Sequence, residues 1–217
     1  MQQSLIPASI DSLSGFKIDI AFRPAREVGG DFYSCRILSS GRQRILLGDV
    51  SGKGAAAAMT AALLLGAAGH REKDSPVELL RHLNLVLFDM HVGGFATCVC
   101  VDLSANGSLT LANAGHLAPY RSGAEIPLSP GLPLGVTPDT EYTGTELNLT
   151  SGDTLTFLSD GVPEARSPTG ELFGFDRTAS ISTQPAESIA KAAQRWGQED
   201  DITVLTLTFA PAEVLHA

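Results

Sequence analysis

Two helical segments lie next to each other in the middle of this sequence, with strand patterns on both sides, and this order restricts the possible folds. Residues 55–68 are rich in Ala and Leu, which are strong helix formers. Residues 75–78 read Ser-Pro-Val-Glu, a capping box that predicts a second helix to about residue 90. Because helices do not alternate with strands, we expect an α+β fold with antiparallel sheets.

The strands are predicted from alternating hydrophobicity and from turn residues. In residues 16–23 the apolar side chains of Phe16, Ile18, Ile20 and Phe22 share one face, as in a half-buried strand. Two pairs of strand-like segments flank short polar turns and predict β-hairpins; they are 31–38 with 44–50, and 95–103 with 108–114. The other expected elements are strands at 117–121, 141–149, 154–159 and 202–209, and a helix at 186–196.

Length and charge limit the organisation of the chain and its partners. A chain of 217 residues predicts one domain, which we place at 15–210, with a linker remnant at 1–14 and a tail at 211–217. The net charge of −9 disfavours nucleic acids and anionic membrane surfaces as partners. With no signal peptide, no apolar run of membrane-spanning length and only three cysteines, we expect a cytoplasmic protein.

Several aspartates stand where strands are predicted to begin or end, often beside glycine. They are Asp31, Asp49, Asp160 and the pair Asp200 and Asp201. Carboxylates that converge at strand ends repel one another unless a cation neutralises them. Oxygen ligands without His or Cys suit Mg²⁺ or Mn²⁺. The spacing alone leaves two interpretations, a metal site or a set of turn-forming aspartates.

A glycine-rich loop offers a competing hypothesis. Residues 52–57 read Gly-Lys-Gly-Ala-Ala-Ala, after a strand and before a helix, as in dinucleotide-binding folds. That fold requires a second parallel strand next, whereas residues 70–74 are polar and lead directly into the capped helix. The sequence therefore disfavours dinucleotide binding.

Six motifs in order resemble the SpoIIE-like branch of the PPM-type (protein phosphatase 2C) serine/threonine phosphatases, over about residues 15–209. They are Glu-Val-Gly-Gly-Asp-Phe-Tyr at 27–33, Gly-Asp-Val-Ser-Gly-Lys-Gly at 48–54, Asn-Ala-Gly-His at 113–116, Leu-Pro-Leu-Gly at 132–135, Ser-Asp-Gly at 159–161 and Asp-Asp-Ile-Thr at 200–203. The resemblance implies two antiparallel sheets packed face to face with helices outside. It also implies a two-metal phosphohydrolase that holds two Mn²⁺ or Mg²⁺ ions.

Several residue roles follow from the resemblance. Asp49 would bridge the two ions, with Asp31, Asp160 and Asp200 as further ligands, preferred over Asp201, and the Val50 carbonyl as a possible contributor. A water activated by both ions would attack phosphorus in line, without a covalent enzyme intermediate. Arg26 and Lys53 are candidates for holding the substrate phosphate, or else ordinary surface cations. His116 is expected to be a structural hydrogen-bonding residue.

The resemblance also implies a biological setting. The expected substrate is a phosphorylated anti-sigma-factor antagonist in a bacterial partner-switching pathway, with an upstream sensor segment or regulator and a possible homodimer. Two alternatives remain open at this stage. One is a non-catalytic module of the same fold that binds a phosphoprotein, and the other is a small-molecule phosphohydrolase.

Overall fold

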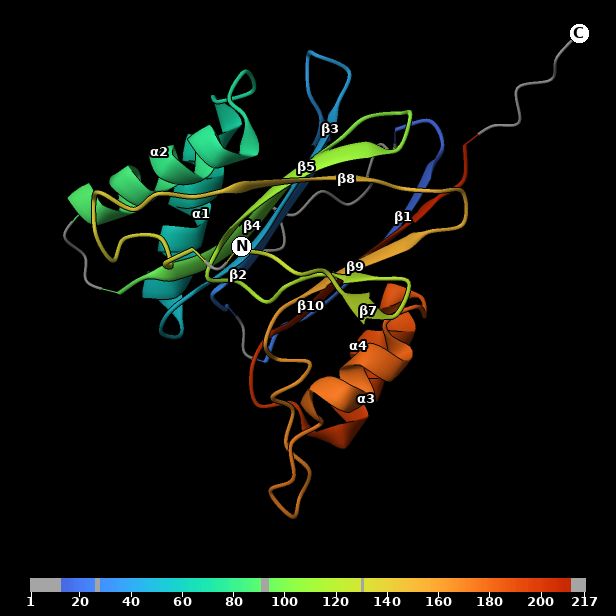
Figure 1. Cartoon of the computed structure of the whole chain (residues 1–217). Coiled ribbons are helices and arrows are strands. Elements are labelled where there is room, and N and C mark those ends of the chain that lie inside the picture. The colour runs from blue at the N-terminus through green and yellow to red at the C-terminus, as the bar shows by residue number, and fades with distance from the viewer. Residues whose placement is uncertain (1–12, 26–27, 91–93, 130, 212–217) are drawn as a thin grey trace, which may run out of the picture.

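The structure is a computed structural model that describes residues 13–25, 28–90, 94–129 and 131–211. It is a sandwich of two antiparallel five-stranded sheets with a pair of helices on each outer face (Figure 1). The expected α+β class and the two-sheet architecture are confirmed. None of the helices within these ranges is long and apolar enough to cross a membrane.

One sheet has the strand order β1-β10-β9-β6-β7. These strands are β1 (Phe16–Arg23), β10 (Ile202–Phe209), β9 (Thr154–Leu158), β6 (Tyr120–Arg121) and β7 (Ala124–Glu125). The other sheet has the order β2-β3-β4-β5-β8. Its strands are β2 (Asp31–Ile37), β3 (Gln43–Val50), β4 (Ala96–Leu103), β5 (Ser108–Ala114) and β8 (Gly144–Asn148). The sequence correctly predicted the β2–β3 and β4–β5 hairpins.

Helices α1 (Ala55–Gly69) and α2 (Pro76–Asp89) cover the second sheet, whereas α3 (Gly174–Ile181) and α4 (Ala186–Gly197) lie beside the first (Figure 1). The predicted capping box at the start of α2 is present, because the Ser75 hydroxyl accepts the Glu78 N–H and the Glu78 carboxylate accepts the Ser75 N–H. No second parallel strand follows α1, which agrees with the rejection of a dinucleotide fold.

Apolar packing forms three layers. Side chains such as Ile45, Leu111 and Phe157 fill the space between the sheets. Leu64 and Leu83 are among those that join α1 and α2 to the second sheet. Cys98 and Cys100, two residues apart on β4, are fully buried free thiols in that outer layer.

The prediction was less accurate where elements are short. The expected strand at 117–121 is reduced to Tyr120–Arg121, because Pro119 has no N–H to donate to a ladder. The helix α3 was not predicted. It has only eight residues and includes the weak helix formers Gly174 and Thr178.

Candidate metal and phosphate site

The predicted aspartates meet at one end of the sandwich, and each stands where its strand begins or ends. Asp31 and Asp49 lie opposite each other at the start of β2 and near the end of β3. Asp160 comes just after β9, and Asp200 and Asp201 come just before β10, which pairs with β9. The Thr203 hydroxyl donates to Asp31 and thereby joins the two sheets at this end.

Mutual repulsion and burial act on these carboxylates. Burial, followed by the charges of Asp160, Asp200 and Asp201, raises the pKa of Asp49 to about 7. Asp31 is 2% exposed, and its burial raises its pKa well above the ordinary value, with a contribution from Asp49. Burial and the charges of Glu164 and Asp200 also raise the pKa of Asp160. These surroundings therefore disfavour the simultaneous ionisation of the three carboxyl groups.

Glycine at position 30 allows the acidic strand ends to approach the backbone closely. A Cβ atom on Gly30 would lie 2.5 Å from the Val50 carbonyl oxygen and 2.6 Å from Asp49 Oδ1. The Val50 N–H donates to the Gly30 carbonyl over 3.2 Å. The absence of a side chain at Gly30 thus leaves room for the Val50 carbonyl and the Asp49 carboxylate to approach.

Asp200 and Asp201 differ sharply in environment. The Asp200 side chain is 52% exposed and forms an ion pair with Lys53, with Nζ 2.9 Å from Oδ2. Asp201 is 4% exposed, and its Oδ1 accepts the Ala25 N–H over 2.9 Å. Its other oxygen, Oδ2, is buried without a hydrogen-bond partner among the described residues. Sequence reasoning missed that Asp201 is the buried member of the pair.

The donor set fits a hard divalent cation, because it consists of carboxylate and carbonyl oxygens from both sheets. Within the described ranges, no three His, Cys, Asp or Glu side chains are already gathered closely enough to hold an ion. An ion would therefore have to draw these carboxylates together. Without a cation between them, the mutual repulsion of ionised carboxylates would oppose that approach.

The remaining predicted residues are placed as follows. Lys53 lies beside Asp200 and is half exposed, so its charge is directed at a predicted ligand. Arg26 falls outside the described residues. His116 is buried, and its Nδ1 lies 2.9 Å from the Thr97 hydroxyl oxygen, while its N–H and C=O bond to the Asn113 side chain. These bonds agree with the expected structural role.

Burial also lowers the pKa of His116 to about 4, an effect that the Leu158 backbone partly offsets. The ring is therefore neutral at physiological pH. Its Nε2 is buried and makes no hydrogen bond of acceptable geometry within the described part of the chain.

Comparison with known proteins gives consistent results. The sequence model of the family "Stage II sporulation protein E (SpoIIE)" matches residues 39–210. Protein IcfG of Synechocystis is 31% identical over 84% of this chain and 34% of its own length. The phosphoserine phosphatase RsbU of Bacillus subtilis is 26% identical over 79% of this chain and 54% of its own length. The chain therefore spans about a third to a half of these curated relatives.

Solved structures with the same fold include phosphatase domains. The SiaA-PP2C domain of Pseudomonas aeruginosa superposes with a TM-score of 0.76 and 25% identity, over 88% of this chain and 85% of that one. The RsbU and RsbW domains of Rv1364c from Mycobacterium tuberculosis give 0.74 and 24%, over 92% and 62%. This similarity extends over both sheets.

Proposed function

Because the chain belongs to the SpoIIE family of PPM-type (protein phosphatase 2C) phosphatases, we propose that it is a metal-dependent protein serine/threonine phosphatase. One observation carries the proposal: carboxylates from both sheets converge at one end of the sandwich, where burial, and after it the charges of neighbouring carboxylates, raises the pKa of Asp31, Asp49 and Asp160. Such repulsion costs folding free energy. A cluster of this kind is explained if a cation offsets it during function.

Asp49 is the central residue of the proposed site, since its carboxylate is influenced by Asp160, Asp200 and Asp201. Asp31, Asp160 and Asp200 would hold Mn²⁺ or Mg²⁺ together with Asp49 and the Val50 carbonyl. When bound, two such ions supply an activated water and offset charge on the phosphoryl oxygens. Thr203 keeps Asp31 oriented through its hydroxyl.

Lys53 and Arg26 are the proposed phosphate-binding residues. Lys53 is held near the acids by Asp200, so once that carboxylate binds a cation the ammonium group is available to an anion. The proposal for Arg26 rests on the resemblance, and Arg26 follows Ala25, whose N–H is fixed by Asp201.

The proposed substrate is a phosphorylated anti-sigma-factor antagonist. The support is that RsbU is named a phosphoserine phosphatase and that RsbU and RsbW domains occur together in the Mycobacterium tuberculosis chain. The relatives are longer than this chain, so an upstream sensor segment or regulator and a homodimer belong to the same proposal. The three free thiols fit its cytoplasmic setting.

The test is hydrolysis of p-nitrophenyl phosphate with and without Mn²⁺ by the wild type, Asp49→Asn and the control Asp139→Asn, whose aspartate is exposed on a loop. We expect turnover that requires Mn²⁺, falls at least about 100-fold in Asp49→Asn and is unchanged in the control. Turnover without added metal after treatment with EDTA, or full activity of Asp49→Asn, would refute the proposal.

Calorimetric titration of Mn²⁺ into the same proteins separates the alternatives. Binding to the wild type without turnover of p-nitrophenyl phosphate or a phosphopeptide would favour a phosphoprotein-binding module. Turnover of a sugar phosphate or nucleotide far above that of any phosphoprotein would favour a small-molecule phosphohydrolase. Absence of Mn²⁺ binding would mean that the proposed ligand set is wrong.

A further inference from the structure

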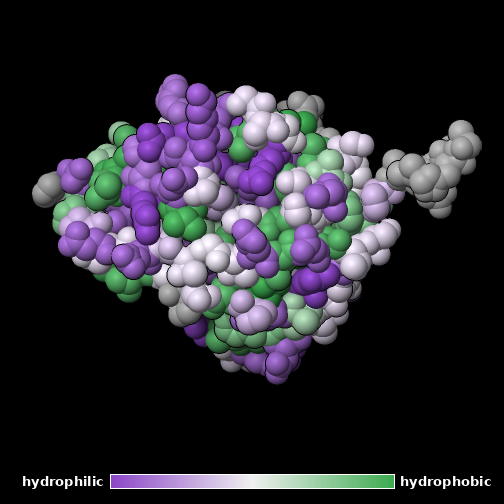
Figure 2. Space-filling view, turned by 45° about the horizontal axis from the view of Figure 1, so that its top comes forward, coloured by the Kyte–Doolittle hydropathy of each residue, from purple (hydrophilic) through white to green (hydrophobic). Residues whose placement is uncertain are grey.

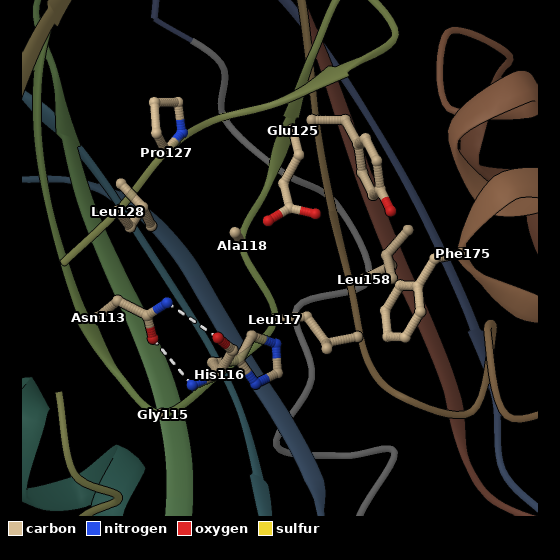
Figure 3. A pocket seen from close by; sticks show the side chains of 11 residues that line it. Asn113, Gly115, His116, Leu117, Ala118, Glu125, Pro127, Leu128, Leu158 and Phe175 are labelled. Carbon is tan, nitrogen blue, oxygen red and sulfur yellow. Dashed lines mark hydrogen bonds between the residues drawn. The ribbon is translucent and has the colours of Figure 1, made fainter. Parts of the chain in front are cut away.

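A pocket of about 480 Å³ lies between residues of the two sheets and helix α3 (Figure 3). It is bounded by the end of β5, the β6–β7 hairpin, the end of β9 and the start of α3. A volume of this size lies within the range of pockets that enclose ligands. None of the four proposed carboxylate ligands lines it.

Most of the pocket wall is apolar. Leu117, Leu128 and Leu158 contribute to it, and Phe175 of α3 completes one side (Figure 3). Phe175 is 57% exposed, although a phenyl ring gains free energy when it is covered. On the surface, apolar side chains appear as separate patches among hydrophilic ones (Figure 2). The pocket therefore offers an apolar contact of limited size.

The charged side chain in the described pocket wall is that of Glu125, which is negative. The Glu125 carboxylate points toward the middle of the pocket, near Ala118 (Figure 3). The pKa of Tyr120 is raised first by the burial of the tyrosine and second by the negative charge of Glu125. No Lys or Arg is among the described residues that line the pocket. The wall consequently favours a positively charged group.

His116 contributes to the pocket wall through its ring. The residue is 7% exposed, its Nε2 is buried, and a hydrogen bond with the Leu158 backbone acts on the ring. The pocket thus combines an apolar wall with one anionic side chain.

The pocket and the acidic cluster share residues of the same elements. His116 bonds through Nδ1 to Thr97, which is the cross-strand neighbour of Asp49 in β3–β4. Leu158 stands two residues before Asp160. The pocket and the acidic cluster are therefore connected through Thr97 and through the short segment from Leu158 to Asp160.

We propose that this pocket is a docking subsite for the protein substrate and that it takes a large apolar side chain next to a Lys or Arg. This inference rests on the proposed phosphatase function. The apolar side chain would pack against Leu128 and Phe175, and the cation would pair with Glu125. Charge complementarity selects this occupant, because the pocket carries a carboxylate and the chain has a net charge of −9.

The experiment uses a series of phosphoserine peptides of equal length. From one peptide to the next a Phe-Arg pair is moved by one position, first before and then after the phosphoserine. An otherwise identical peptide carries Ala-Ala. For each position the ratio of kcat/KM for the two peptides is measured with Mn²⁺. We expect a kcat/KM ratio of about 10 or more at one position, which corresponds to a free-energy difference of about 1.4 kcal/mol between the two peptides. It should fall to about 1 in Glu125→Gln and in Phe175→Ala.

The control variant is Glu146→Gln, an exposed glutamate on β8, which should keep the wild-type ratio. Ratios near 1 at every position, or a ratio that Glu125→Gln leaves unchanged, would overturn the docking inference even if p-nitrophenyl phosphate is hydrolysed. If the wild type hydrolyses nothing, the phosphatase proposal fails. Binding of the same peptides, labelled and followed by fluorescence anisotropy, then decides on the pocket: a Phe-Arg preference lost in Glu125→Gln supports it, and no preference rejects it.

Discussion

Replacing Asp49 by asparagine should stabilise the metal-free protein while it abolishes metal binding. Burial and neighbouring carboxylates raise the pKa of Asp49 from 3.8 to about 7. A folded state that binds a proton more tightly than the unfolded chain loses stability as the pH rises. The contribution of Asp49 to the free energy of unfolding should therefore decrease as the pH rises from about 4 through about 7, and the decrease is complete only well above pH 7.

The size of the effect follows from the pKa. Three pKa units correspond to about 4 kcal/mol, and solvent at the open side of the carboxylate reduces this to about 2–4 kcal/mol. Asparagine has nearly the same shape and no charge. In EDTA at pH 8, Asp49→Asn should thus be about 2–4 kcal/mol more stable than the wild type, measured by urea unfolding followed by circular dichroism.

Added Mg²⁺ should largely close that gap. A ligand at 100 times its Kd stabilises the folded state by about 2.7 kcal/mol, and only the wild type should gain this. The exposed control Asp139→Asn should stay within about 0.5 kcal/mol of the wild type in both conditions. An Asp49→Asn protein that is equal to or less stable than the wild type in EDTA at pH 8 would refute the reasoning about repulsion.

Three further predictions concern stability and reactivity. Asp102→Ala removes the carboxylate that lies 2.6 Å from Nε of the buried Arg44. It should lower the free energy of unfolding in urea by about 3–5 kcal/mol. The control Glu171→Ala breaks the exposed ion pair with Arg177 and should lower it by at most about 1 kcal/mol. Gly30→Ala places a methyl group 2.5 Å from a carbonyl oxygen and should weaken Mn²⁺ binding at least about 10-fold in calorimetry. Ellman's reagent should find no fast-reacting thiol until urea unfolds the protein, because burial raises the pKa of every cysteine, Cys35, Cys98 and Cys100.

Elements with strong local signals were predictable from the sequence. The capping box before α2 and the alternation in β1 depend on residues close together in the chain, and both appear as expected. Helix α3 depends on packing instead. Its buried Thr178 bonds to the Gly174 carbonyl, and Arg177 lies over the Trp196 ring of α4. Such contacts join segments that the sequence alone does not place side by side.

The candidate site divides in the same way. That aspartates occupy strand ends was visible in the sequence, because strand boundaries are set locally. Which carboxylate is buried was not, since it depends on how the loop at 28–30 packs against the start of β10. A Cβ atom on Gly29 would lie 1.4 Å from Asp201 Oδ2. The missing side chain at position 29 is therefore what admits the Asp201 carboxylate, and only the folded structure brings the two together.

The Lys53–Asp200 ion pair connects the electrostatics of the cluster with the proposed chemistry. The gap between Lys53, Asp200 and the loop at 28–30 measures about 10 Å³, room for about one water and not for a phosphoryl group. Both side chains are half exposed, so the pair contributes at most about 1 kcal/mol. A cation that attracts Asp200 therefore competes with a weak interaction, and its binding would release the Lys53 ammonium next to the place where a phosphate must enter. We therefore expect Lys53 to remain paired with Asp200 until a cation attracts that carboxylate, and to become available to a phosphate afterwards.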